Sequence, residues 1–213
     1  MKAVSLIKVV LISATVVFSA GAQAQFGGLS LPGKIAGGSG GATEDAGSVV
    51  KNARNSLASF VKAKLGLIEA MGGSEELAAQ KNMLEGLKQG DAAASKEDLE
   101  TIVSLDKATG DMINKKTADN AQLDAKNKAT AGKSMAEYVS GLVSAKKMVS
   151  SVTNLSKNPL SLGSNLGAVT FLAKELPGVI SSGTSTTSTL LSYLNSNGVD
   201  TSESKKAAGD LGV

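Results

Sequence analysis

Cysteine, histidine and tryptophan are absent from this chain of 213 residues. Without cysteine, the chain has no disulfide framework, so packing alone must hold the fold together. Without cysteine and histidine, zinc loses its usual ligands and a serine nucleophile loses its usual proton acceptor. Histidine ligation of haem is excluded as well. The missing residue types therefore exclude most of the common catalytic sites and cofactor-binding sites.

Aromatic residues and a strong charge of one sign are also missing. Beyond residue 24 the aromatic residues are only five: Phe26, Phe60, Tyr138, Phe171 and Tyr193. Five scattered rings do not form the stacking platform that sugars or single-stranded nucleic acids require. The chain has 22 basic and 19 acidic residues, interspersed and without a long basic run. The sequence therefore predicts no nucleic-acid partner.

The first 24 residues have the order of a secretory signal peptide. Lys2 and Lys8 give a basic start, an uncharged apolar run follows over residues 9–20, and Ala22-Gln23-Ala24 offers small residues to a signal peptidase. The apolar run is shorter than the ~20 residues that a transmembrane helix needs. We expect cleavage before Gln25 and a periplasmic or secreted protein. Loss of 24 of the 213 residues would leave 189, with 20 basic and 19 acidic side chains.

Residues 25–43 contain seven glycines and one proline, which predicts a flexible leader. Residues 44–198 are expected to form one helical bundle domain. Residues 199–213 form a charged C-terminal tail, for which one more helical turn or fraying is expected. Thr43, Glu44 and Asp45 resemble a helix start, with a capping hydroxyl before two acids.

The first predicted helix runs from Ala46 to Met71 and ends at Gly72-Gly73. Its apolar residues recur with a period of 3.6 and lie on one side: Ala46, Val49, Val50, Ala53, Leu57, Phe60, Val61, Leu67, Ile68 and Met71. Lys64 falls in the middle of this stripe. It is interpreted as a long stem that carries its charge out to solvent, and the alternative is a charge kept for a partner or an anionic ligand.

Two further helices are predicted before residue 157. Ser74 caps the second, Leu77, Leu84 and Leu87 lie on one of its sides, and Gly90 closes it. Ser95 opens the third, and Asp98 three residues later resembles a capping box. The apolar stripe thins between Asn114 and Ser134. A continuous helix is favoured over residues 95–156, with a solvated middle that projects beyond its packing partners. A break that joins two helices is the alternative.

The C-terminal third carries sharper boundaries. Asn158-Pro159 ends the preceding helix, because the residue before proline avoids the helical region. A helix is predicted over residues 162–176, Pro177-Gly178 is expected to break it, and another follows over residues 179–195 with Asn197-Gly198 as its stop. The small side chains of residues 181–189 would permit close helix–helix approach. The predicted fold is all-α, a bundle of four to six helices that includes a hairpin of long helices from the first and third segments.

Several strings imitate catalytic signatures and lack the required chemistry. Residues 37–41 fit the G-x-S-x-G nucleophile elbow, but the chain has no histidine to activate the serine. Residues 127–134, NKATAGKS, approach the phosphate-binding G-x-x-x-x-G-K-[ST] pattern, but asparagine replaces the first glycine and no strand precedes it. Ser-x-x-Lys needs no histidine and occurs at Ser48/Lys51, Ser59/Lys62, Ser104/Lys107, Ser144/Lys147 and Ser202/Lys205. Its companion motifs are absent.

Metal and membrane signals are equally weak. Asp119, Asn120 and Asp124, and the acids Glu97, Asp98 and Glu100, do not reproduce calcium-loop spacing. The G-x-x-x-G of Gly163 and Gly167 is interpreted as tight packing inside a bundle rather than as a membrane contact. No catalytic residue, cofactor site or metal site is therefore predicted.

These observations favour a non-enzymatic exported protein that acts in protein–protein interaction or in envelope or extracellular structure. Its expected partner is another protein or a second copy of itself. The alternative is a carrier or membrane-surface binder that holds a lipid or another apolar molecule between amphipathic helices. That alternative depends on the apolar and small residues between Leu160 and Leu194.

Overall fold

The computed structural model describes residues 45–73, 77–88, 94–120 and 122–213. The predicted signal peptide, the leader and the second helix's predicted ends at Ser74 and Gly90 lie outside these residues. Within them the chain forms six α-helices and no strand, so the all-α prediction is confirmed. The helices are α1 (Ala46–Ala70), α2 (Ala78–Lys88), α3 (Lys96–Ala118), α4 (Ala125–Ser156), α5 (Leu166–Ser196) and α6 (Ser202–Ala208).

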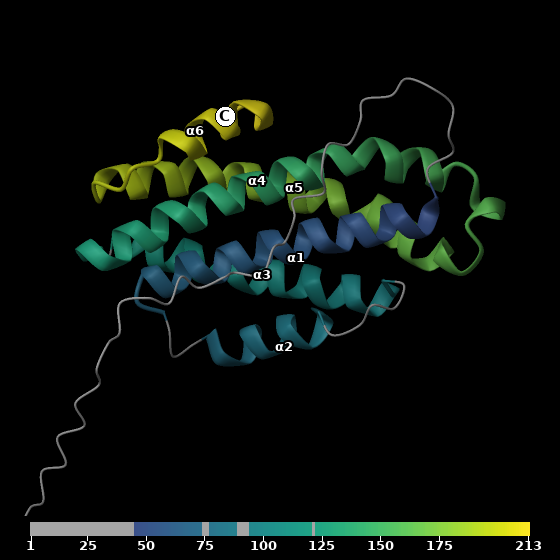
Figure 1. Ribbon diagram of the computed structural model, residues 1–213, viewed down its shortest axis with the longest axis horizontal. Coiled ribbons are helices and arrows are strands. Elements are labelled where there is room, and N and C mark those ends of the chain that lie inside the picture. The colour runs from purple at the N-terminus through teal and green to yellow at the C-terminus, as the bar shows by residue number, and fades with distance from the viewer. Residues whose placement is uncertain (1–44, 74–76, 89–93, 121) are drawn as a thin grey trace, which may run out of the picture. The chain divides into compact units, whose positions relative to one another are not determined.

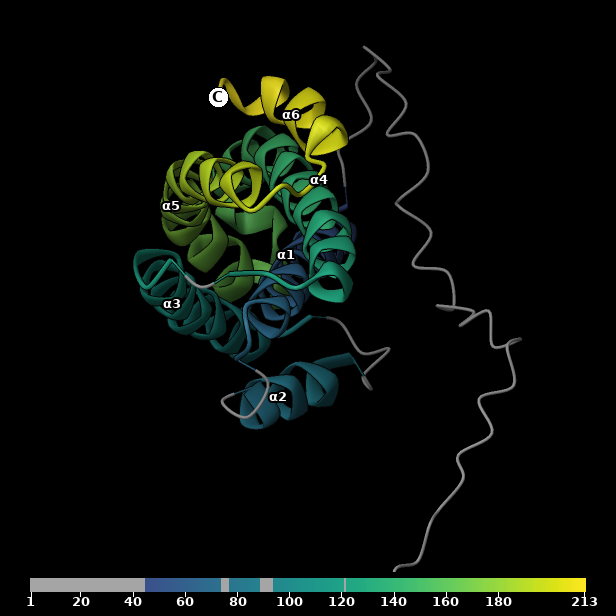
Figure 2. The same cartoon turned by 90° about the vertical axis from the view of Figure 1, so that its left-hand side faces the viewer.

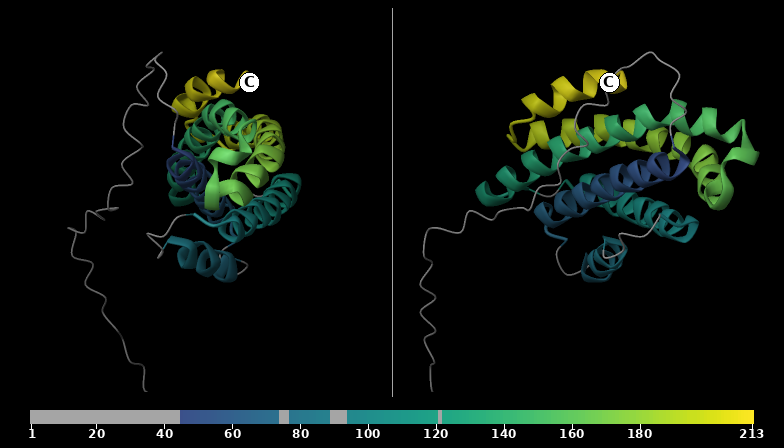
Figure 3. Two further views of the ribbon diagram at one scale, coloured as in Figure 1. Left: turned by 90° about the vertical axis from the view of Figure 1, so that its right-hand side faces the viewer. Right: turned by 45° about the vertical axis from the view of Figure 1, so that its right-hand side comes forward.

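Four of the helices form the bundle, and two lie outside it. α1 packs against α3 and α4, and α5 closes the ring by packing against the same two helices. Figure 1 shows these four helices running side by side, and Figure 2 shows the ring end-on. The short helices α2 and α6 lie on opposite sides, α2 against α1 and α3, and α6 mainly against α4 (Figure 3).

Side-chain caps define the starts of three helices. Asp45, rather than Thr43, caps α1, because its carboxylate accepts a hydrogen bond of 3.0 Å from the Ser48 amide. At α3 the predicted capping box is confirmed, with Ser95 and Asp98 each bonding the other's amide. Asp124 caps α4 through the Asn127 amide at 2.7 Å. Each cap satisfies an amide that the helix itself leaves without a partner.

The prediction of one helix over residues 95–156 is wrong. α3 ends at Ala118, Asn120 has a positive φ of 47°, and α4 begins only at Ala125. Between them Leu123 is buried, and its amide donates to Asn197 Oδ1 at 3.0 Å. The polar stretch is therefore a turn anchored to the end of α5, so the expected helical projection does not exist. Both halves of the predicted third segment pack on α1.

The prediction of a break at Pro177-Gly178 is also wrong, because α5 continues through Pro177 for 31 residues. Proline removes one backbone hydrogen bond and is costly inside a helix. Here its ring lies on the exposed side, while Leu172, Leu176 and Val179 are buried on the bundle side. Apolar packing on both sides of Pro177 offsets the lost hydrogen bond. The boundaries at Asn158-Pro159 and Asn197-Gly198 are confirmed.

Close packing depends on glycines other than the predicted pair. Gly163 and Gly167 are exposed, and a Cβ on Gly163 would meet no neighbour, so their interpretation as a packing motif is wrong. A Cβ on Gly141 of α4 would instead lie 3.1 Å from the backbone of Phe60 in α1. A Cβ on Gly183 of α5 would lie 2.8 Å from Leu142. The predicted close approach within residues 181–189 is thus present at Gly183.

Candidate functional site

The centre of the bundle contains a buried ion pair. Lys64 of α1 is 1% exposed, and its Nζ lies 2.5 Å from Asp106 Oδ1 and 3.0 Å from the Asp106 carbonyl oxygen of α3. The ammonium also lies 4.8 Å from the centre of the Phe60 ring. The interpretation that Lys64 reaches solvent is therefore wrong. Its charge is neutralised inside the protein, which suits a structural role better than binding of an external anion.

Tyr138 of α4 lies beside this pair and links α4 to α5. Its ring is 4.7 Å from that of Phe60, and its hydroxyl donates to the Gly183 carbonyl oxygen at 2.8 Å. The Thr187 hydroxyl donates to the same carbonyl. Burial raises the pKa of Tyr138 well above its ordinary value. The phenol therefore stays protonated at neutral pH, as a hydrogen-bond donor between helices.

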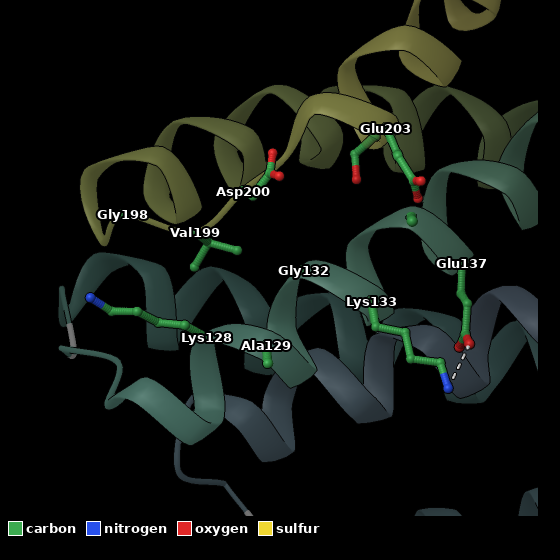
Figure 4. Close-up of a pocket in the computed structure, with 11 residues that line it drawn as sticks. Lys128, Ala129, Gly132, Lys133, Glu137, Gly198, Val199, Asp200 and Glu203 are labelled. Carbon is green, nitrogen blue, oxygen red and sulfur yellow. Dashed lines mark ion pairs between the residues drawn. The ribbon is translucent and has the colours of Figure 1, made fainter. Parts of the chain in front are cut away.

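A surface groove of about 580 Å³ lies where the start of α6 crosses α4, and we call it the α4–α6 groove (Figure 4). Its floor consists of small residues of α4, and its far wall is the α5–α6 connection together with the first turn of α6. It is lined by Lys128, Ala129, Gly132, Lys133, Ala136, Glu137, Gly198, Val199, Asp200, Glu203 and Ser204.

The groove brings distant parts of the sequence into contact. Ala129, Gly132 and Ala136 are spaced three and four residues apart, so they share one face of α4. A Cβ on Gly132 would lie 3.2 Å from the Asp200 carbonyl oxygen. Glycine at position 132 therefore allows the α5–α6 connection to approach the helix closely. The groove exists because of a contact between residues about 70 positions apart.

Charges of both signs surround the floor. Lys128, Lys133 and Glu137 come from α4, and Lys133 and Glu137 are 3.9 Å apart. Asp200 and Glu203 lie on the opposite side (Figure 4). Asp200 accepts bonds from both the side chain and the amide of Ser202, and these lower its pKa. The Asp200 carboxylate therefore stays charged at neutral pH.

A second groove, of about 730 Å³, is more open and more apolar, and we call it the α4–α5 groove. Val149, Pro177 and Ile180 supply its apolar part, and Lys146 and Lys147 lie at its edge with Ser150 and Ser181. Lys146 also donates to the carbonyl oxygens of Asp210 and Leu211 at 2.9 and 3.4 Å, so it fixes the C-terminal turn onto α4.

Three of the five serines in the Ser-x-x-Lys motifs donate their hydroxyl groups to nearby acceptors. Ser48 donates to Asp45, Ser144 to the Ser140 carbonyl oxygen, and Ser202 to Asp200. These hydroxyls thus bond carboxylates or backbone oxygens instead of the lysines of their motifs. Residues 127–134 lie inside α4, so they form a helix and not a phosphate-binding loop. Residues 37–41 lie outside the described residues.

Metal ligands are not gathered in the part of the chain that the structure covers, where no three acidic side chains approach closely enough to share an ion. Asp119 and Asp124 instead stand at the end of α3 and the start of α4. None of the helices described here combines the length and apolar character needed to cross a bilayer.

Comparison with known proteins gives no relative. No family model, no curated protein and no solved structure matches the chain. The function must therefore be argued from the residues themselves.

Sequence reasoning missed both grooves. Ala129, Gly132 and Ala136 carry a signal, since small residues recur there at helical spacing. Their partner, the segment 198–204, gave no sign of lying against them. Residues 199–213 are predicted to form a charged tail, whereas Val199, Thr201 and Ser204 are buried.

Proposed function

We propose that this chain is an exported, non-enzymatic protein that binds a segment of another protein in the α4–α6 groove. One observation carries the proposal. The groove combines a floor of alanine and glycine with opposed rims of charged side chains.

Each part of the groove suits a polypeptide ligand. A floor without large side chains lets a second backbone come close, as the α5–α6 connection already does at Gly132. Lys128 on the α4 side and Asp200 and Glu203 on the other side can pair with opposite charges of the ligand. Such pairs fix register and exclude wrong partners more than they add affinity. The proposed ligand is a polar segment that carries both signs of charge.

A photo-crosslinking amino acid at Ala129 tests the proposal in the cell that exports the chain. Ala129 is an exposed residue of the groove floor, and Thr130 is its exposed neighbour that does not line the groove. We expect a discrete adduct from position 129 and none from position 130, with the adduct identified by mass spectrometry. An adduct with a second copy would identify self-association, which light scattering would then show in solution.

A variant that fills the groove provides a second test of the proposed binding site. Ala129→Trp should abolish the adduct formed from a crosslinker at Ala136, whereas Thr130→Trp should leave it. Equal adducts from all positions, or none from position 129, would remove the groove as a protein-binding site.

A further inference from the structure

The charge distribution of the bundle is uneven along the sequence. Residues 138–199, which include the C-terminal half of α4 and all of α5, contain four lysines and one acidic residue: Lys146, Lys147, Lys157, Lys174 and Glu175. The processed chain expected from the sequence is nearly balanced, so this segment concentrates positive charge. Positive charge in one segment of a balanced protein favours a negatively charged partner.

Two lysines of α4, Lys146 and Lys147, line the α4–α5 groove. Lys146 and Ser150 of α4 and Lys157, which directly follows the helix, recur at spacings of four and seven residues, so they follow one stripe toward the end of α4. Lys147 lines the groove beside the exposed Pro177 and the half-buried Ile180. Cationic side chains therefore stand directly next to apolar atoms.

An exposed apolar tip lies at the end of the bundle, directly after the end of α4. The α4–α5 connection contains Leu160, in the short helical turn Pro159–Ser161, and Leu166 begins α5. Leu160 is 97% exposed and Leu166 is 43% exposed. Figure 1 shows this connection at one extremity of the bundle, away from α2 and α6. An almost fully exposed leucine three residues from Lys157 places an apolar group and a cation together at the tip.

Negative groups close to this surface are few. Glu175 lies 3.4 Å from Lys174, and Asp210 lies near Lys146, whose Nζ is held by the carbonyl oxygens of the C-terminal turn. In the described part of the chain, Lys147 and Lys157 form no ion pair with a carboxylate. The charges of these two lysines can therefore attract a negatively charged partner.

We infer that the surface formed by the α4–α5 groove, Lys157 and Leu160 docks onto a bilayer that contains anionic phospholipid. Lysines next to apolar side chains match the boundary between lipid headgroups and acyl chains, where charge attraction and apolar burial act together. The inference is independent of the α4–α6 groove, which lies at the other half of α4.

Vesicle co-sedimentation tests the inference with the full chain as purified from the exporting cell. The probes are vesicles of phosphatidylethanolamine with phosphatidylglycerol in equal parts, and vesicles of phosphatidylcholine alone. We expect binding to the anionic vesicles only, weakened by added salt. Lys147→Glu with Lys157→Glu should weaken it by more than about tenfold, because each lysine near an anionic surface contributes on the order of a fivefold factor.

Matched variants distinguish docking through this surface from effects of the net charge or of any exposed apolar residue. Lys115→Glu with Lys126→Glu changes the net charge equally but lies on α3 and the start of α4, so binding should remain. Leu160→Asn should reduce binding severalfold, while Met83→Asn, which alters a 49% exposed apolar residue on α2, should not. Circular dichroism would establish that every variant is folded.

Three results would overturn the inference. They are equal binding to both kinds of vesicle, no binding to either, and equal losses in the matched pairs. Loss of self-association in Leu160→Asn without any vesicle binding would assign the surface to a second copy of the chain instead.

Discussion

The helices at the centre of the bundle and the outer helix α2 have the same kind of amphipathic sequence pattern. Their side chains are packed differently. At the centre, Gly141 brings the α4 backbone against Phe60, and the buried polar groups of Lys64, Asp106 and Tyr138 have partners. At the edge, Leu84 of α2 and Leu77, directly before the helix, are buried, and Gln80 Oε1 is buried with no hydrogen-bond partner among the described residues. Similar helical periodicity therefore does not give equal stability. The centre should set global unfolding, and α2 should open first.

The largest effect is expected from breaking the buried ion pair. Asp106→Leu leaves the Lys64 ammonium buried without its carboxylate and should lower the free energy of unfolding by about 3–5 kcal/mol. The double variant Lys64→Met with Asp106→Leu should recover most of this loss, because two apolar side chains remove the unpaired charge. Urea denaturation measures both. A single variant as stable as the parent would show that the pair is not buried in solution.

A matched glycine pair compares the two regions directly. Gly141→Ala places a Cβ 3.1 Å from the Phe60 backbone and should cost about 1–3 kcal/mol, because the two helices must move apart. Gly86→Ala in α2 meets no neighbour and should stabilise by about 0.5–1 kcal/mol through helix propensity. Thermal unfolding of the two variants should shift in opposite directions. Shifts of the same sign would contradict the proposed difference in packing.

Arg54 is the main polar link between α2 and the bundle. Its guanidinium donates to the Leu87 carbonyl oxygen at 2.9 Å and lies 3.5 Å from an Asp98 carboxylate oxygen. Arg54→Met should cost about 1–2 kcal/mol. Hydrogen exchange should accelerate in the amides of α2 while those of α4 and α5 change little. Arg54→Lys keeps the positive charge but lacks the planar guanidinium group. Its loss of stability and its hydrogen exchange in α2 should lie between those of the parent and of Arg54→Met.

The smallest effect is expected at the surface of α2. Lys81 Nζ lies 2.7 Å from Glu69 Oε2, but both side chains are well exposed. Because water and salt screen such a pair, Lys81→Ala should change stability by less than about 0.5 kcal/mol. Chemical denaturation of this variant beside Arg54→Met would distinguish an exposed ion pair from a partly buried one. A loss as large as that of Arg54→Met would mean that α2 docks mainly through charge.

The predictions from sequence succeeded where a few neighbouring residues fix the conformation. The capping box at Ser95 and the boundaries at Asn158-Pro159 and Asn197-Gly198 are local features, and all three are present. The break at residues 119–124 had a local signal as well, since Asn120 and Asp124 suit a helix end and a helix start. The two candidate grooves required contacts across the chain and were not predicted.

The sequence by itself determined that the chain is helical and which faces of its helices are apolar, because these follow from side-chain spacing and backbone preferences within a few turns. Tertiary structure decided that α5 continues through Pro177, because packing of Leu172, Leu176 and Val179 outweighs one lost hydrogen bond. It also decided that Lys64 is buried, since only the fold places Asp106 beside it. The α4–α6 groove likewise arises from a contact between α4 and the α5–α6 connection, which no local pattern specifies.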